Sequence, residues 1–153
     1  MASLDLKVPP PVIVGLCAGL AWVLARSTPG FTDLLPARLA IAAALVLAGV
    51  LLALSGLLAF RKIGTTANPH TPGKSNAIVR SGPYRFTRNP MYLGLTLALL
   101  GWCAYLANPL TLVAVVMFVT YITRLQIMPE ERLLLEKFGE PYAQYIKSVR
   151  RWI

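Results

Sequence analysis

The feature that most restricts what this chain can fold into is an apolar run at residues 39–60 that contains no charged residue. A bilayer core of about 30 Å requires roughly 20 helical residues to cross it, and this run meets that length. Three further apolar runs lie at residues 8–25, 91–106 and 110–127. Only helices and closed barrels satisfy their backbone groups in lipid, and these lengths do not suit barrel strands. The pattern predicts an all-α fold, a polytopic membrane helical bundle of about four transmembrane helices.

The composition agrees with a membrane protein of one domain, residues 1–153. Hydrophobic residues make up 56% of the chain and charged residues only 14%, against about 25% charged residues in a soluble domain. The net charge of +9 would suggest nucleic acid for a soluble protein, but beside apolar runs it follows the positive-inside rule. With His70 as the single histidine and with Cys17 and Cys103 inside apolar runs, we expect neither a metal nor a nucleic-acid partner.

The connections between the runs differ in length and charge. Ala107-Asn108-Pro109 predicts a tight turn and therefore a hairpin of the third and fourth helices, whereas residues 61–90 form a long polar loop. Lys and Arg gather in this loop and in the tail after residue 127, and only Arg26 and Arg38 fall on the other side. The charge bias predicts an integral protein of the bacterial inner membrane with both termini, and a cap built from the loop and the tail, in the cytoplasm.

The tail has several helix signals. A helix either begins at Pro129 or continues the fourth span with a kink there, and Gly139 is expected to end it. An aromatic stripe at helical spacing favours packing on the membrane surface; it comprises Phe138, Tyr142, Tyr145, Val149 and Trp152. Gly15 and Gly19 form a small-xxx-small pair, which indicates a helix contact only weakly.

Polar residues cluster at the cytoplasmic ends of the predicted spans. The acidic pair Glu130-Glu131 is costly at a bilayer edge unless it meets water or cations. Arg88 or Arg132 would neutralise it, or the ammonium group of a ligand would. Arg88 in turn would extend to a lipid phosphate or pair with a ligand carboxylate. A zwitterionic amino-acid ligand would use both sets of charges at once.

These clusters resemble the motifs of a known family. The first reads Ile78-Val79-Arg80-Ser81-Gly82-Pro83-Tyr84 and then Arg88-Asn89-Pro90-Met91-Tyr92-Leu93-Gly94. The second reads Glu130-Glu131 and then Phe138-Gly139-Glu140-Pro141-Tyr142-Ala143-Gln144-Tyr145. Their order around a hairpin resembles the membrane methyltransferases represented by isoprenylcysteine carboxyl methyltransferase and phosphatidylethanolamine N-methyltransferase. The resemblance covers residues 78–152 and implies a cofactor, S-adenosylmethionine, bound by about residues 76–94 and 128–152.

The resemblance also implies roles for individual residues. Glu130 or Glu131 would bind the ammonium group or the ribose hydroxyls, and Arg88 the carboxylate. Aromatic faces suit a sulfonium cation, and glycines allow backbone to approach a ligand closely. The cofactor-binding residues expected on this basis are Asn76, Ile78, Val79, Gly82, Tyr84, Arg88, Asn89, Pro90, Tyr92, Gly94, Glu130 and Glu131.

Two departures from the family pattern affect the expected chemistry. Asn89 and Asn76 stand where the family has histidines, and asparagine cannot act as a general base. Methyl transfer to a carboxylate needs no base, whereas an amine or thiol acceptor would lose a proton to water or to Glu131. Arg151 stands where eukaryotic members tend to have proline, so either it holds an acceptor carboxylate or it binds anionic lipid. Glu131 and Arg151 are therefore the catalytic candidates.

The expected activity is methyl transfer to a lipophilic or lipid acceptor that enters from the bilayer. A carboxyl of isoprenylcysteine type is the first acceptor, and a phospholipid amine or a small thiol is an alternative. A non-catalytic membrane scaffold, in which both clusters are lipid anchors and salt bridges, is the competing class. A transporter or channel subunit is disfavoured because the four runs carry no ionisable residue at mid-depth.

Overall fold

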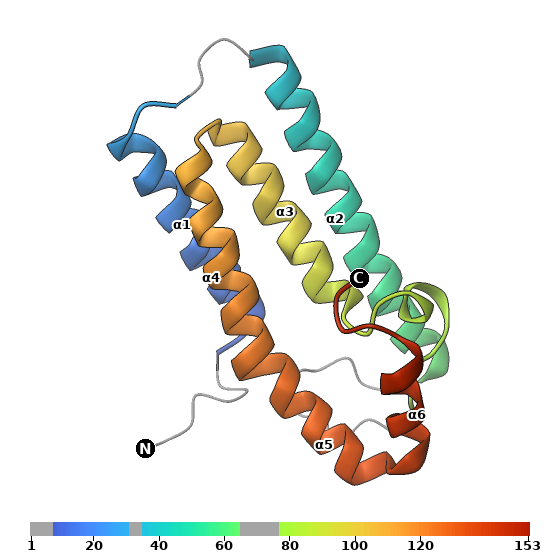
Figure 1. The fold of residues 1–153 in the computed structure, drawn as a ribbon. Coiled ribbons are helices and arrows are strands. Elements are labelled where there is room, and N and C mark those ends of the chain that lie inside the picture. The colour runs from blue at the N-terminus through green and yellow to red at the C-terminus, as the bar shows by residue number, and fades with distance from the viewer. Residues whose placement is uncertain (1–7, 31–34, 65–76) are drawn as a thin grey trace, which may run out of the picture.

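The structure, a computed structural model, describes residues 8–30, 35–64 and 77–153. For residues 35 and 36 it describes the backbone alone. In these residues all regular structure is helical apart from one isolated bridge between Thr87 and Arg150. Long helices α1 (Pro10–Ser27), α2 (Leu35–Ile63), α3 (Pro90–Leu106) and α4 (Leu112–Ile122) lie side by side in a bundle (Figure 1). The prediction of an all-α membrane bundle is confirmed.

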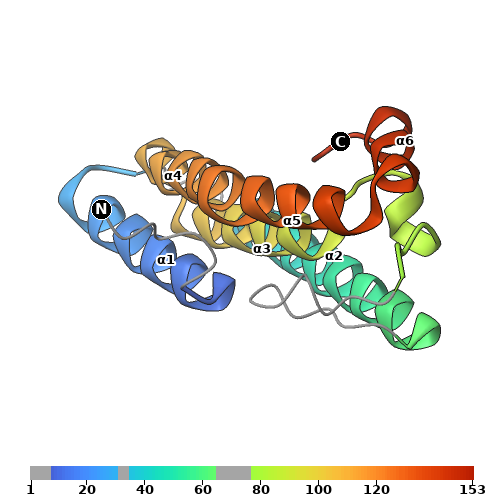
Figure 2. The same ribbon diagram turned by 90° about the horizontal axis from the view of Figure 1, so that it is seen from below.

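The helices differ in whether they are long enough to cross the hydrocarbon core of a bilayer. Among the described residues, three helical stretches are long and apolar enough to cross a membrane, at Pro10–Ser27, Ala37–Ile63 and Pro109–Phe138. Helix α3 has 17 residues and is shorter. It lies between α2 and α4 (Figures 1 and 2) and buries residues along its whole length. Its neighbours therefore cover the helix that is least able to span lipid alone.

Glycines allow α2 and α3 to pack with their backbones close together. A Cβ atom added at Gly94 would lie 2.5 Å from the carbonyl oxygen of Gly49, and one added at Gly101 would lie 2.9 Å from that of Ala42. Small residues are a common means of helix association in lipid. The contact expected at Gly15 and Gly19 is not a close one among the described residues, because a Cβ at either position would meet none of their atoms within 4 Å.

The predicted hairpin between α3 and α4 is present, and it is tied to α1. Ala107 takes the left-handed conformation at φ 51°, and the Asn108 side chain accepts a hydrogen bond from the backbone of Leu110. The Asn108 amide also donates to the Thr28 hydroxyl at 2.7 Å, just after α1 ends. A 3-10 turn at Pro109–Thr111 then leads into α4.

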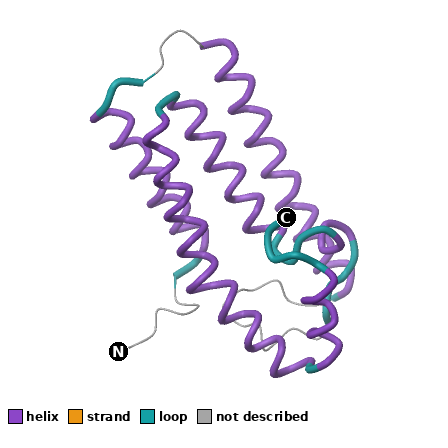
Figure 3. The backbone as a smooth tube through the Cα atoms, viewed as in Figure 1, coloured by secondary structure: helices purple, strands orange, loops and turns teal. Residues whose placement is uncertain are grey.

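The fourth span does not stop where the tail begins. Helix α4 passes through a π-helical turn, Thr123–Ile127, directly into α5 (Met128–Phe138), as the continuous tube in Figure 3 shows. Proline within a helix clashes with the carbonyl one turn earlier. The wider π turn contains Leu125, one turn before Pro129, and gives the proline ring room. Of the two readings of Pro129, continuation of the helix is therefore the correct one.

Gly139 reverses the chain after α5. Its φ of 58° is in the region that favours glycine, and helix α6 (Glu140–Ser148) follows at once. The predicted position of the aromatic stripe on the membrane surface is wrong, because Tyr142 and Tyr145 are buried within the protein. Beyond α6, residues 149–153 run back toward the start of α3 (Figure 1).

Candidate functional site

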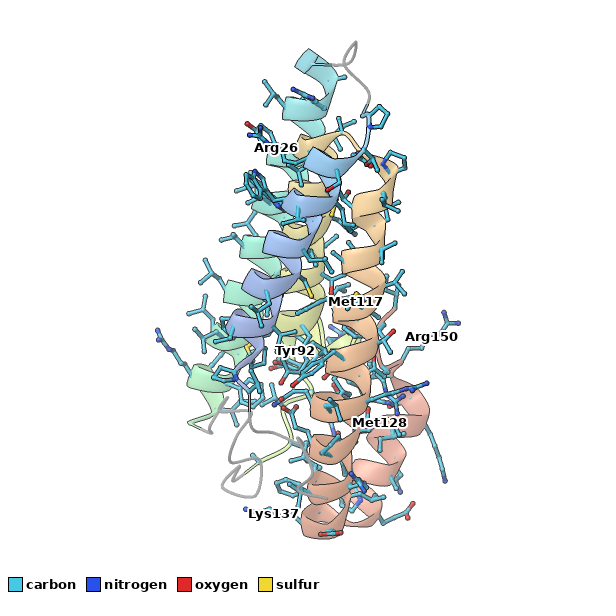
Figure 4. The ribbon with its side chains drawn as sticks, turned by 90° about the vertical axis from the view of Figure 1, so that its left-hand side faces the viewer. Arg26, Tyr92, Met117, Met128, Lys137 and Arg150 are labelled. Atoms are coloured by element: carbon cyan, nitrogen blue, oxygen red, sulfur yellow. The ribbon has the colours of Figure 1, made fainter. Side chains whose placement is uncertain are left out.

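The charged and aromatic residues of both clusters meet at one end of the bundle. Here α3 begins, α4 passes into α5, and the loop with its 3-10 turn Gly82–Arg85 packs against α6. In Figure 4, Tyr92 lies at this level, Arg26 lies at the opposite end and Met117 lies between them on α4. Residues more than sixty positions apart in the chain, such as Tyr84 and Tyr145, are therefore neighbours.

Three charged side chains form one ion cluster. Glu131 accepts from Arg88 Nη2 at 2.7 Å, and from Arg151 through Nη2 at 2.6 Å and Nε at 3.1 Å. The hydrogen bonds to Glu131 raise the pKa of the Arg151 guanidinium above its ordinary value. Two cations surround one carboxylate, so the cluster carries one net positive charge and suits an anionic ligand.

Arg88 is the most buried member of this cluster, with a side chain only 8% exposed. Its Nη1 donates to the carbonyl oxygens of Ile146 and Val149, each at 2.8 Å. These carbonyls end α6, where cations are favoured. Its Nε is buried and has no hydrogen-bond partner in the part of the chain that the structure describes. A buried N–H that remains unpaired is costly, and a ligand that accepts from it would remove this cost.

Glu130 has a different environment from its neighbour Glu131. Its Oε1 accepts from the Tyr92 hydroxyl at 2.6 Å and from the Gln126 amide at 2.8 Å, and neither donor reaches Oε2. Gln126 belongs to the π turn and is 1% exposed. In the described part of the chain, no basic group lies within ion-pair distance of Glu130. This carboxylate is therefore available to a cation from a ligand.

A small cavity of about 70 Å³ lies beside Arg88. Its wall is aromatic and aliphatic, and the lining residues are Phe60, Ala77, Ile78, Val79, Tyr84, Arg88, Leu134, Phe138, Tyr142 and Tyr145. Burial raises the pKa of the Tyr145 phenol to about 12 and raises the pKa values of Tyr84 and Tyr142 as well. All three phenols remain neutral at physiological pH. Aromatic faces suit a cation, and the Tyr145 ring already has the Arg80 guanidinium 5.7 Å from its centroid.

Residues 149–153, which we call the 149–153 segment, close one side of the ion cluster. The backbone N–H of Arg88 donates to the carbonyl of Arg150 at 3.0 Å. The Asn89 amide and the Thr87 hydroxyl donate to the carbonyl of Arg151 at 2.9 Å and 3.3 Å. Trp152 Nε1 donates to the Thr123 hydroxyl at 3.1 Å. The backbone on each side of Arg151 is thus fixed to other elements.

The structure separates the residues predicted from sequence into groups. Ile78, Val79, Tyr84 and Arg88 line the cavity, and Tyr92, Glu130, Glu131 and Arg151 form the polar contacts beside it. Three others serve the fold, since Gly82 has a φ of 60°, Pro90 begins α3 and Gly94 packs on α2. Asn89 contacts the 149–153 segment. Asn76 lies outside the described residues.

Several residues of this site could not be predicted from the sequence. Gln126 and Phe60 had no local signal, because their roles depend on the π turn and on the position of the end of α2. The aromatic stripe, which includes Tyr142 and Tyr145 of α6, did carry a signal, and its helical spacing would have indicated a buried face of the protein equally well.

The donor set of this site fits S-adenosylmethionine. Among the described residues Arg88 Nε is unpaired and suits a carboxylate, Glu130 suits an ammonium group, and the aromatic walls suit a sulfonium or a base. The cavity volume corresponds to only a few water molecules. A nucleoside cofactor would therefore enter only if the segments around the cavity move apart, as is common for ligand sites.

Fold and site together define an integral membrane protein with a cationic, aromatic-walled site at one end of a helical bundle. Residues 37–141 match the sequence model of the phospholipid methyltransferase family. The chain belongs to this family of integral membrane methyltransferases, and it is therefore a membrane methyltransferase. The match extends from α2 to the start of α6. A Haemophilus influenzae protein described as uncharacterized is 44% identical over 63 residues, which are 41% of this chain and all of that protein.

Proposed function

We propose that this methyltransferase uses S-adenosylmethionine to methylate a lipophilic acceptor that carries an anionic group. The observation that carries the proposal is the net positive cluster of Arg88, Glu131 and Arg151 beside an aromatic cavity at the end of a membrane bundle. A carboxyl of isoprenylcysteine type is the first acceptor. A phospholipid amine is the alternative, because a phosphate would meet the same cations.

The cofactor would be held by groups from both sequence clusters. Bound S-adenosylmethionine supplies a methyl group on a sulfonium cation. Arg88 Nε would donate to its carboxylate, and Glu130 Oε2 would accept from its ammonium group. Neutral Tyr84, Tyr142 and Tyr145 would surround the positively charged sulfur and exclude water from it.

Arg151 is the group proposed to meet the acceptor. Its side chain is 37% exposed, against 8% for Arg88, so it is the more solvent-accessible of the two cations in the ion cluster. Both oxygens of Glu131 are occupied by guanidinium N–H groups, which favours orientation of Arg151 by Glu131 over proton removal. A carboxyl acceptor is already ionised at neutral pH and needs no base. Its alignment with the methyl donor then provides the rate enhancement.

The site is proposed to face the cytoplasm, with the acceptor arriving laterally from the bilayer. The exposed basic residues at this end support that orientation through the positive-inside rule; they include Arg61, Lys62, Arg85, Arg124, Lys147 and Arg150.

Calorimetry with S-adenosylmethionine, on protein in detergent and in lipid nanodiscs, tests the cofactor part of the proposal. Wild-type protein is expected to bind saturably, and Glu130→Gln to bind at least about tenfold more weakly because it loses a charge-assisted contact. Glu136→Gln, an exposed position on the same helix, is the matched control and should bind as wild type does. Absence of binding by folded wild-type protein in both environments would contradict the proposal and favour a scaffold role.

Transfer of a labelled methyl group then distinguishes the acceptors. A farnesylated cysteine derivative with a free carboxyl and a vesicle of phosphatidylethanolamine are offered separately. Label in a base-labile methyl ester would support carboxyl methylation. Label in the headgroup amine would instead favour the phospholipid alternative.

A further inference from the structure

The 149–153 segment has little regular structure of its own but is held at consecutive residues. Carbonyl oxygens of Val149, Arg150 and Arg151 all accept hydrogen bonds from residues 87–89. Trp152 is anchored separately, to the π turn. Because backbone groups make most of these contacts, the position of the Arg151 side chain depends on how its own backbone is held.

Asn89 has an unusual role at the start of α3. It occupies the N-cap position, where asparagine normally accepts a hydrogen bond from the first turn of the helix. Here its side chain makes no such bond. Its Nδ2 donates instead to the carbonyl oxygen of Arg151 at 2.9 Å, 62 residues away in the chain. The amide thus connects the start of a membrane helix to the residue whose guanidinium binds Glu131.

The Asn89 contact is supported by a second one. The Thr87 hydroxyl donates to the same Arg151 carbonyl at 3.3 Å and accepts from the Asn89 backbone N–H at 3.1 Å. Two side chains therefore converge on one carbonyl, while Arg151 Nε and Nη2 bind Glu131 on the other side. Arg151 is therefore held at both ends, by its backbone carbonyl on residues 87 and 89 and by its guanidinium on Glu131.

We infer that Asn89 is a positioning residue that holds the Arg151 carbonyl and thereby sets the Arg151 guanidinium on Glu131, where it meets the acceptor. The inference rests on the proposed function for the part that Arg151 has in catalysis. It does not require Asn89 to touch cofactor or acceptor. A donor at this position is what matters, so histidine, which also offers a ring N–H, should replace asparagine, and aspartate should not.

The experiment compares Asn89→Asp with Asn89→His in the full chain, with Lys147→Gln as an exposed control. The first measurement is the fluorescence of Trp152, taken as the difference between each protein and the same protein with Trp152→Phe. It needs neither cofactor nor acceptor. Asn89→Asp replaces the amide donor with a carboxylate, which cannot donate to the Arg151 carbonyl. We therefore expect this variant to release the 149–153 segment. The Trp152 emission should shift to the red and be quenched more strongly by iodide. Asn89→His and Lys147→Gln should match wild type.

The second measurement is methyl transfer to the anionic lipophilic acceptor. Asn89→Asp is expected to raise the acceptor KM about tenfold while the cofactor Kd changes less than about twofold, and Asn89→His should restore the wild-type KM. Unchanged Trp152 emission in Asn89→Asp would overturn the inference. So would loss of transfer with normal emission, since Asn89 would then contact a ligand directly. The two proposals can fail separately. If wild-type protein neither binds cofactor nor transfers methyl, the proposed function is overturned. If the Trp152 emission still changes in Asn89→Asp, the contact between Asn89 and the Arg151 carbonyl remains supported.

Discussion

Arg88 binds three parts of the protein, and only one of its partners is a charged side chain. Its role as a cation near the acidic pair could be predicted from sequence, because a charge pattern is visible along the chain. Its bonds to the carbonyls of Ile146 and Val149 could not, since they depend on how α6 folds back. The same is true of Asn89. The sequence shows an amide at this position, but it does not show that the amide donates to the Arg151 carbonyl.

Arg88→Lys tests the fork geometry of this residue. An ammonium group cannot reach Glu131 and the end of α6 together, because its donors radiate from one point. We expect the free energy of unfolding to fall by about 2–4 kcal/mol and the cofactor Kd to rise about tenfold or more. Thermal unfolding in detergent and calorimetry measure the two effects. Arg85→Lys, at an exposed neighbouring position, is the control, and equal behaviour of the two variants would refute a special role for Arg88.

At the scale of elements, the apolar runs were sufficient to locate the helices, but their packing was not predictable. Gly15 and Gly19 have the spacing of a contact motif, yet the close contact is made by Gly49, Gly94 and Gly101. All of these glycines lie in apolar helices, and sequence spacing does not say which face meets a neighbour. Likewise, Pro129 permitted either a helix start or a continuation, and the π turn before it decides between them.

Gly94→Ala is expected to destabilise the bundle by about 1–3 kcal/mol through overpacking. The new methyl group would lie 2.5 Å from the Gly49 carbonyl oxygen and 3.0 Å from Ala53, so two helix backbones would have to separate. The unfolding temperature in detergent measures this effect. Gly19→Ala makes the same chemical change at a position where no described residue lies within 4 Å of the new methyl group, and it should cause no loss. A loss of equal size at both positions would contradict the packing explanation.

The docking of α6 should be sensitive to alkaline pH. Burial raises the pKa of Tyr145 from 10.0 to about 12, so the neutral phenol is favoured in the folded state. This contribution to stability is fully present below about pH 10 and is lost as the pH rises through about 12. The phenol also donates to the Tyr84 carbonyl at 2.8 Å.

Tyr145→Phe removes both effects. We expect it to lower the free energy of unfolding by about 1 kcal/mol at neutral pH and to make the decline between about pH 10 and 12 shallower. Unfolding curves across this pH range provide the measurement. Tyr105→Phe, at an exposed tyrosine on α3, should follow the wild-type curve. An identical alkaline decline in Tyr145→Phe and wild type would show that another group controls it.

At the scale of the whole molecule, the length of one helix supports the proposal that the site lies at the edge of the bilayer. The continuous helix Pro109–Phe138 has 30 residues, which is about 45 Å at 1.5 Å per residue and exceeds a hydrocarbon core of about 30 Å. Its last turns, with Glu130 and Glu131, therefore reach the membrane boundary. The sequence could predict the lengths of the apolar helices, because these depend on hydropathy along the chain, whereas the cavity depends on contacts between distant segments.

The proposed orientation can be tested with single cysteines and a membrane-impermeant maleimide on intact bacterial cells. Arg26→Cys, at the end opposite the site, should react, and Lys147→Cys on α6 should react only after the cells are permeabilised. The native Cys17 and Cys103 are buried and should give little background. The reverse labelling pattern would place the site on the outer side of the membrane.

The 149–153 segment also has a consequence for biosynthesis. It follows every other described part of the site in the chain, so during translation it leaves the ribosome after all of the helices. Arg88 and Glu131 are both synthesised before Arg151, because they precede it in the chain. The ion cluster can therefore form only after Arg151 has been added. A chain whose synthesis stops before Arg151 therefore lacks one of the two cations of the ion cluster.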